Sequence, residues 1–204
     1  MPNRRLWITV FALSALCHEL AVAEASPLVP LPEIKVGDQW KLDTKDLYNN
    51  QLKSSSYMVV TAVSATRLDF DADGTTGFMT PALTVLDSPT ATNDTGYEFL
   101  RFPLEVGKKW DFKTQWRNKR SGATGKSEFE VTVVGSESVT VAAGAFDAIK
   151  LRAIGQMSMA SGYWKVTLLY WYAPQARQIV RFEWRDHKRD LDHLRELVEY
   201  KLTP

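Results

Sequence analysis

The chain has 204 residues, of which 45% are hydrophobic, with 25 Lys and Arg, 24 Asp and Glu and a single Cys. Its formal charge of +1 lacks the basic excess typical of nucleic-acid-binding proteins, so we expect no nucleic-acid partner. One cysteine excludes an intramolecular disulfide framework and a Cys-rich zinc site. The length is sufficient for a single domain with a substantial hydrophobic core.

Residues 1–23 have the pattern of a secretory signal peptide. Arg4 and Arg5 give a positive start, and residues 6–17 form an apolar run too short for a transmembrane helix. The sequence AVA at 21–23 matches the small-x-small cleavage pattern. The sequence therefore predicts an exported protein of the bacterial periplasm or cell envelope, which is not transmembrane after cleavage.

Cys17 lies at the end of this apolar run and raises the alternative of lipoprotein processing. The residue before it is Leu16, whereas a lipoprotein peptidase favours a small residue at that position. Cleavage after Ala23 removes this cysteine and more basic than acidic residues. We therefore expect a mature protein that is formally neutral and contains no cysteine.

A Pro-rich lead at 24–33 precedes one predicted β domain at 34–204. Short runs rich in Val, Thr, Phe, Tyr and Trp alternate there with Gly, Asn, Asp and Ser, as in antiparallel sheets. Asp73-Gly74 is a hairpin turn signal, and Gly135 is expected to end a strand. The predicted strands include 38–48, 57–64, 68–71, 128–134, 138–141 and 146–154.

The clearest strand is 163–172, in which side chains alternate between two faces. Its core face is expected to carry Trp164, Val166, Leu168, Tyr170 and Tyr172, and residues 179–185 continue the alternation with Val180, Phe182 and Trp184 inside. The segment 191–202 fits helical spacing and also a strand with Leu194, Val198, Tyr200 and Leu202 on one face. We favour the strand, because a hairpin-like polar stretch precedes it.

Two segments of the domain share the pattern apolar-x-Val-Gly-x-x-Trp-x-apolar, one beginning at residue 34 and one at residue 104. In each, Gly is expected to form a turn or bulge and the Trp to anchor the core. Two related meanders would follow from this internal repeat. The predicted fold is therefore all-β: a curved antiparallel sheet, or half-barrel, made of these two meanders.

Two polar clusters resemble metal sites but are interpreted as turns. Asp69, Asp71, Asp73 and Gly74 begin like a calcium loop, yet position twelve is Thr80 rather than a bidentate Glu. Residues 186–193 hold both histidines of the mature chain, His187 and His193, among three aspartates. Basic residues interleave with them and oppose a cation, so a solvated turn is expected, with no metal and no cofactor.

Nothing in the sequence marks a nucleophilic hydrolase, because no Gly-x-Ser-x-Gly elbow and no exported Cys is present. Carboxylate chemistry stays open as an alternative. Its candidates are Glu98, Glu128, Glu130 and Glu183, which all lie in β-like runs. Alternation places the last three on the polar face, and we therefore expect a protein that is not an enzyme.

The aromatic residues of 163–184 are the strongest functional signal. They fit a large core for a sheet without disulfides, and they also fit an apolar concavity for an acyl chain or a platform for sugars. As candidate ligand-binding residues we select Trp164, Tyr170, Tyr172 and Trp184.

The second half resembles the TapB-like proteins, a family of exported bacterial β-rich proteins of uncharacterised function. The resemblance rests on the stretches 102–110, 133–148, 170–174 and 196–200; many members have Pro where Ala142 or Ala143 stands here. It implies an envelope location and a curved antiparallel sheet, and it offers no catalytic residues to transfer.

The sequence thus predicts a non-enzymatic envelope protein that binds an apolar or amphipathic ligand, such as a lipid, or an envelope protein partner, in a concave sheet face. Two alternatives stay open. One is a carboxylate-based envelope hydrolase or carbohydrate-active protein. The other is a structural interaction module that uses exposed sheet edges.

Overall fold

The computed structural model describes residues 28–186 and 192–204, so the predicted signal peptide and His187 lie outside the described residues. The described residues form twelve β-strands and one short 3-10 turn, η1 (Pro174–Ala176). The first six strands are β1 (Gln39–Asp46), β2 (Leu52–Val63), β3 (Leu68–Ala72), β4 (Thr75–Met79), β5 (Val85–Asp87) and β6 (Ala91–Tyr97). The others are β7 (Lys109–Asn118), β8 (Thr124–Val141), β9 (Gly144–Met159), β10 (Gly162–Ala173), β11 (Gln178–Asp186) and β12 (His193–Lys201).

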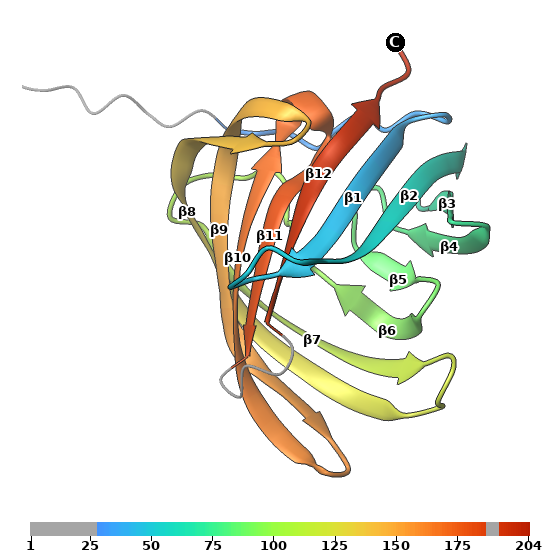
Figure 1. The fold of residues 1–204 in the computed structure, drawn as a ribbon, viewed down its shortest axis with the longest axis vertical. Helices are drawn as coiled ribbons and strands as arrows, with labels where there is room; N and C mark the ends of the chain where they lie inside the picture. Colours follow the sequence, from blue (N-terminus) through green and yellow to red (C-terminus); the bar gives the residue numbers. More distant parts are fainter. Residues whose placement is uncertain (1–27, 187–191) are drawn as a thin grey trace, which may run out of the picture.

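Each strand pairs antiparallel with its neighbour in the chain, and β12 pairs back onto β1. The all-β class and the curved antiparallel sheet are confirmed, and the curl continues until the two ends of the sheet meet as a closed barrel (Figure 1). The turn between β9 and β10 lies at the bottom of this view and the turn between β8 and β9 at the top. We call these the β9–β10 end and the β8–β9 end of the barrel.

The wall is uneven, because long strands form one side and short strands the other. β8 and β9 have 18 and 16 residues, whereas β5 has three. β6 pairs with β7 through only three residues, 91–93. Beyond these residues, the side chain of Asp94 connects β6 to β7, because its Oδ1 accepts hydrogen bonds from Gln115 N at 2.8 Å and Thr114 Oγ1 at 3.0 Å.

The predicted strand end at Gly135 is wrong, because β8 continues through it to Val141. The register shifts by one residue between Val133 and Gly135, which is a β-bulge that bends the strand without ending it. The extension carries the β8–β9 turn across to β12, where Ala143 N donates to the Leu197 carbonyl at 3.2 Å.

The two Val-Gly turns have the same geometry. Gly37 and Gly107 have φ angles of 91° and 87°, a conformation that glycine adopts without strain. Gly37 N donates to the Val60 carbonyl and Gly107 N to the Val133 carbonyl, both at 2.9 Å. The internal repeat itself stays a prediction, but the two motifs build equivalent turns before β1 and β7.

The interior is divided into two apolar clusters. The first lies on the inner face of β7–β11 and includes Phe112, Phe129, Leu151, Leu168 and Phe182. The second lies under β1–β4 and includes Trp40, Val60, Phe70 and Met79, with Trp171 and Leu197 from the later strands. The described part of the lead joins the first cluster through Val29, which bridges to Leu104 by hydrogen bonds of 2.9 and 2.8 Å.

Candidate functional site

Tyr170 and Tyr172, two of the four predicted ligand-binding residues, lie inside the first cluster. The segment between β6 and β7 covers them: Phe99 lies 5.5 Å from the Tyr170 ring and Phe102 lies 5.2 Å from the Tyr172 ring. Tyr170 Oη donates to the Phe99 carbonyl at 2.8 Å. Burial raises the pKa of both hydroxyls, so they stay neutral at physiological pH. In this structure both tyrosines pack the core and have no surface for a ligand.

Trp164 and Trp184, the other two, lie nearer the β9–β10 end, close to the start of β10 and the end of β11, and are half-buried. Trp184 faces Leu168 across the β10–β11 ladder, and Trp164 precedes Leu168 by four residues, which is about 13 Å along the strand. Trp184 stacks on His193 with 5.7 Å between ring centroids. Among the described residues, nothing accepts a hydrogen bond from the buried Nε1 of either tryptophan. The four predicted residues are therefore two core residues and two separated rim residues.

Sequence reasoning missed Arg195, which lies on the same inner face. Arg195 pairs with Phe182 in the β11–β12 ladder, and its Cζ lies over the Phe182 ring at 5.3 Å. The predicted strand is present as β12, but the four residues expected on one face do not share it: His193 and Arg195 point inward here, and Leu194 is buried on the other face. A register shift near Leu42 then returns Tyr200 to the face of Trp40. Strict alternation counted back from Leu197 would have found Arg195.

Thr44 and Ser54 continue this row across the barrel wall. Arg195 pairs with Thr44 of β1, and Thr44 pairs with Ser54 of β2. Alternation from the buried Trp40 places both hydroxyls on the inner face, where Thr44 is half-buried and Ser54 is exposed. We call Trp184, His193, Arg195, Thr44 and Ser54 the open inner face. It combines aromatic surface, one cation and two hydroxyls; Asp46, which pairs with His193 in the same ladder, is bound to Lys53 at 2.9 Å.

Three of the four carboxylates proposed for catalysis face a cation, whereas Glu130 is exposed on the outer side of β8, between the buried Phe129 and Val131. Glu98 bonds to Arg101, and Glu128 lies 3.3 Å from Lys113. Glu183 lies on the outer face of β11, where Arg181 and Arg185 donate to it at 2.8 and 2.7 Å. Burial by itself would raise the pKa of Glu183, but these two guanidinium groups outweigh it and lower the pKa overall.

This shift predicts that Glu183 stabilises the protein at neutral pH. A carboxyl whose folded pKa is depressed contributes stability above its unfolded pKa, here about 4.5, and loses it as pH falls further. We expect Glu183→Gln to lower the melting temperature at pH 7 and to flatten its decline between pH 5 and 3. Thermal melts across that range check this, and a decline as steep as that of wild type would contradict it.

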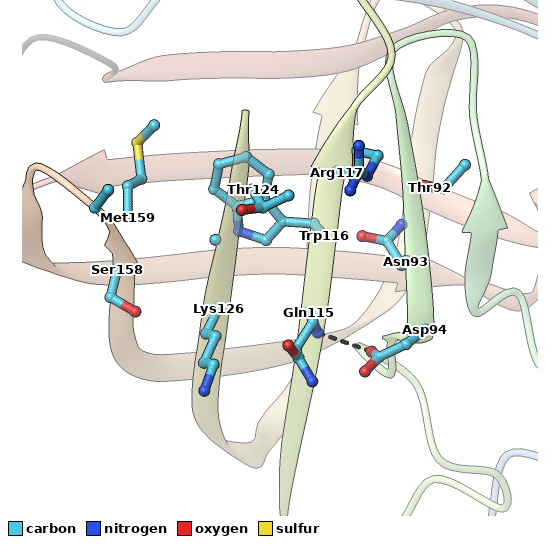
Figure 2. Close-up of a pocket in the computed structure, with 12 residues that line it drawn as sticks. Thr92, Asn93, Asp94, Gln115, Trp116, Arg117, Thr124, Lys126, Ser158 and Met159 are labelled. Carbon is cyan, nitrogen blue, oxygen red and sulfur yellow. Dashed lines mark hydrogen bonds between the residues drawn. The ribbon is translucent and has the colours of Figure 1, made fainter. Parts of the chain in front are cut away.

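A hollow of about 650 Å³ lies across β6–β9 and contains none of the four predicted residues (Figure 2). Its walls carry Gln115, Arg117 and Lys126, and a hydrogen bond from Gln115 N to Asp94 joins two of the lining residues. The Asp94 pKa is lowered chiefly by the Gln115 amide. Trp116 reaches over Gly125, where its ring leaves no room for a Cβ. The lining mixes these polar side chains with the apolar surface of Trp116 and Met159.

An apolar groove of about 540 Å³ lies beside the lead, lined chiefly by Leu31, Leu100, Phe102 and Pro103. The charged residues at its edge, Glu98 and Arg101, already bind each other at 2.8 Å. The groove therefore offers apolar surface without a free charged group, in contrast to the open inner face.

Within residues 28–186 and 192–204, no three His, Cys, Asp or Glu side chains gather closely enough to hold a metal ion. Asp192 and His193 belong to these ranges, whereas His187 and Asp190 lie outside them. Asp192 accepts from the Asp186 amide at 2.6 Å and from the Tyr48 hydroxyl. In the same parts of the chain, no helix has both the length and the apolar character that crossing a bilayer requires.

A scan of protein-family models finds no match, and a search of curated proteins finds no significant relative. Two solved structures have a similar fold. One is a candidate exported protein with a YMCC-like fold from Bacteroides fragilis, with 18% sequence identity and a TM-score of 0.58. The other is a candidate lipoprotein from Parabacteroides distasonis, with 14% sequence identity and a TM-score of 0.62. Each alignment covers 86% of this chain and 100% of the other chain. This likeness shows a fold shared with bacterial proteins named for export or lipidation; the resemblance to TapB-like proteins stays a prediction.

Proposed function

We propose that this protein is a non-enzymatic, exported binding protein of the bacterial cell envelope, and that it binds an amphipathic ligand on the open inner face. The predicted signal peptide and the printed names of the two structural neighbours support the location. The resemblance to exported β-rich proteins supports it further. The sequence predicts ligand binding on a concave face of the sheet. The proposal limits the binding surface to one end of that face.

One observation carries the proposal. The inner face is filled by Phe99 and Phe102 toward the β8–β9 end, but it stays accessible toward the β9–β10 end, where Arg195 and Ser54 are exposed. There the stacked Trp184 and His193 rings lie next to hydroxyl-bearing and cationic side chains. A surface that is apolar on one side and polar on the other matches an amphiphile better than a purely apolar or purely polar ligand.

The other two hypotheses have less support. The candidate carboxylates Glu98, Glu128 and Glu183 are engaged by cations, and Glu183 faces outward. An interaction module based on exposed sheet edges needs an unpaired edge, and the closed ring of strands pairs β1 with β12.

The test is binding of two dodecyl-chain probes, laurate and dodecyl maltoside, by isothermal titration calorimetry below their micellar concentrations. We expect both to bind the wild-type protein, and Trp184→Ala to weaken both about tenfold through loss of ring contact. Tyr163→Ala is the matched control, because Tyr163 is 67% exposed on the opposite face of β10 and should leave binding unchanged.

A variant in the apolar groove separates the two candidate surfaces. Leu31→Glu places a charge in that groove, and Leu31 is 49% exposed, so the fold should tolerate it. If Leu31→Glu still binds the probes and Trp184→Ala binds them more weakly, the result supports the open inner face as the binding surface. Absence of binding by both probes, together with no lipid extracted from protein expressed in the periplasm, would overturn the proposed function.

A further inference from the structure

Arg195 has an unusual position for a cation. It points to the side of the sheet that forms the first apolar cluster, with its Cζ 5.3 Å above the Phe182 ring. Phe182 is itself buried against Phe99 and Tyr170. The Arg195 side chain is nevertheless exposed to solvent. The guanidinium group is therefore surrounded by the barrel wall and still accessible.

Among the residues that the structure describes, the guanidinium group also has no counter-charge. Apart from the Phe182 ring, none of residues 28–186 and 192–204 makes a hydrogen bond, ion pair or ring contact with it. The two arginines on the outer face of β11 differ, because Arg181 and Arg185 both bind Glu183. Desolvation by the surrounding wall lowers the Arg195 pKa, and no neighbouring charge opposes this effect.

Because the Arg195 side chain keeps contact with solvent, its N–H donors are available to the oxygens of a ligand. Arginine is suited to carboxylate and phosphate groups because its planar fork donates two parallel hydrogen bonds to their oxygens. Thr44 lies directly across the ladder from Arg195, about 5 Å away, and its hydroxyl can donate to a further oxygen. Trp184 and His193 extend the apolar surface on the other side.

We infer that the open inner face selects acidic amphiphiles: Arg195 and Thr44 bind a carboxylate or phosphate head group, and the acyl chain lies against Trp184 and His193. This inference rests on the proposed function and adds the chemical class of the ligand. A neutral amphiphile of equal chain length leaves Arg195 unpaired and binds more weakly.

The experiment compares laurate, dodecyl phosphate and dodecyl maltoside, which share one chain, on the wild-type protein and on Arg195→Gln by calorimetry. We expect at least one acidic probe to bind the wild type about tenfold or more tightly than the maltoside. Arg195→Gln should remove that preference, because it should weaken binding of the acidic probes much more than binding of the maltoside. The comparison of laurate with dodecyl phosphate identifies the preferred acid group.

Arg152→Gln is the matched control, because it removes the same charge from the outer face of β9, between the inward Leu151 and Ala153. Both variants alter an exposed side chain, and a thermal melt verifies that each folds. If Arg152→Gln loses as much affinity for the acidic probes as Arg195→Gln does, the preference reflects general charge attraction and the inference is overturned. If maltoside binds as tightly as both acids, the inference fails while the proposed function stands. If no probe binds, the inference fails, and the proposed function fails with it when no lipid is extracted from the protein either.

Discussion

Replacing Trp40 or Trp110 with Ala is expected to lower the free energy of unfolding by about 3–5 kcal/mol in each case. Both side chains are almost fully buried, at 1% and 4% exposure, and they belong to different apolar clusters. Each indole also donates a hydrogen bond, from Trp40 to the Ala176 carbonyl at 2.7 Å and from Trp110 to the Glu98 carbonyl at 2.9 Å. Each variant therefore loses packing and leaves a carbonyl without its donor.

Chemical denaturation monitored by circular dichroism measures this loss. Trp→Phe at the same positions keeps most of the ring and removes the indole donor, so its cost should be smaller. Tyr163→Ala serves as the exposed control and should change the free energy by less than about 0.5 kcal/mol. A Trp40→Ala protein as stable as wild type would contradict the role of the Val-Gly-x-x-Trp motif as a core anchor.

Gly155→Ala is expected to destabilise the protein by about 3 kcal/mol, at the upper end of the usual cost of overpacking. A Cβ on Gly155 would lie 2.6 Å from Phe129 Cδ1 and closer still to the Glu128 carbonyl oxygen. Phe129 is buried and stacks on Phe112, so neither it nor the backbone of β8 can give way easily. The central β8–β9 ladder would have to shift.

Gly135→Ala is the matched control for this prediction. Gly135 lies in the same pair of strands, no heavy atom lies within 4 Å of its added Cβ, and its φ is not positive. Alanine there should be neutral or stabilising by up to about 1 kcal/mol, because it restricts the unfolded chain. Equal melting temperatures for the two variants would show that β8 and β9 adapt at Gly155.

Much of the fold follows from local patterns in the sequence. Alternation along 163–172 predicts five inward side chains, of which Trp164 is half-buried and four are buried: Val166, Leu168, Tyr170 and Tyr172. Asp73-Gly74 predicts the hairpin between β3 and β4, which pairs over five residues. These features depend on period-two geometry and turn chemistry, which act over a few residues and are visible in one sequence.

The candidate site was only partly predictable. Trp184 was selected from the sequence and lies on the open inner face, whereas Tyr170 and Tyr172 are covered by Phe99 and Phe102, more than 60 residues earlier in the chain. Arg195 was missed because a register shift changes which face the later residues of β12 occupy. Neither the covering segment nor the shift leaves a signal in local periodicity.

The sequence by itself determined the β class, the antiparallel hairpins and the two tryptophans that anchor the core, because these depend on neighbouring residues and on hydrophobicity. The tertiary structure decided that β12 pairs with β1, that the segment after β6 fills one end of the inner face, and that Arg195 stays exposed at the other end. The reason is that strand closure and covering contacts join residues distant in the chain, and their register depends on bulges at single positions.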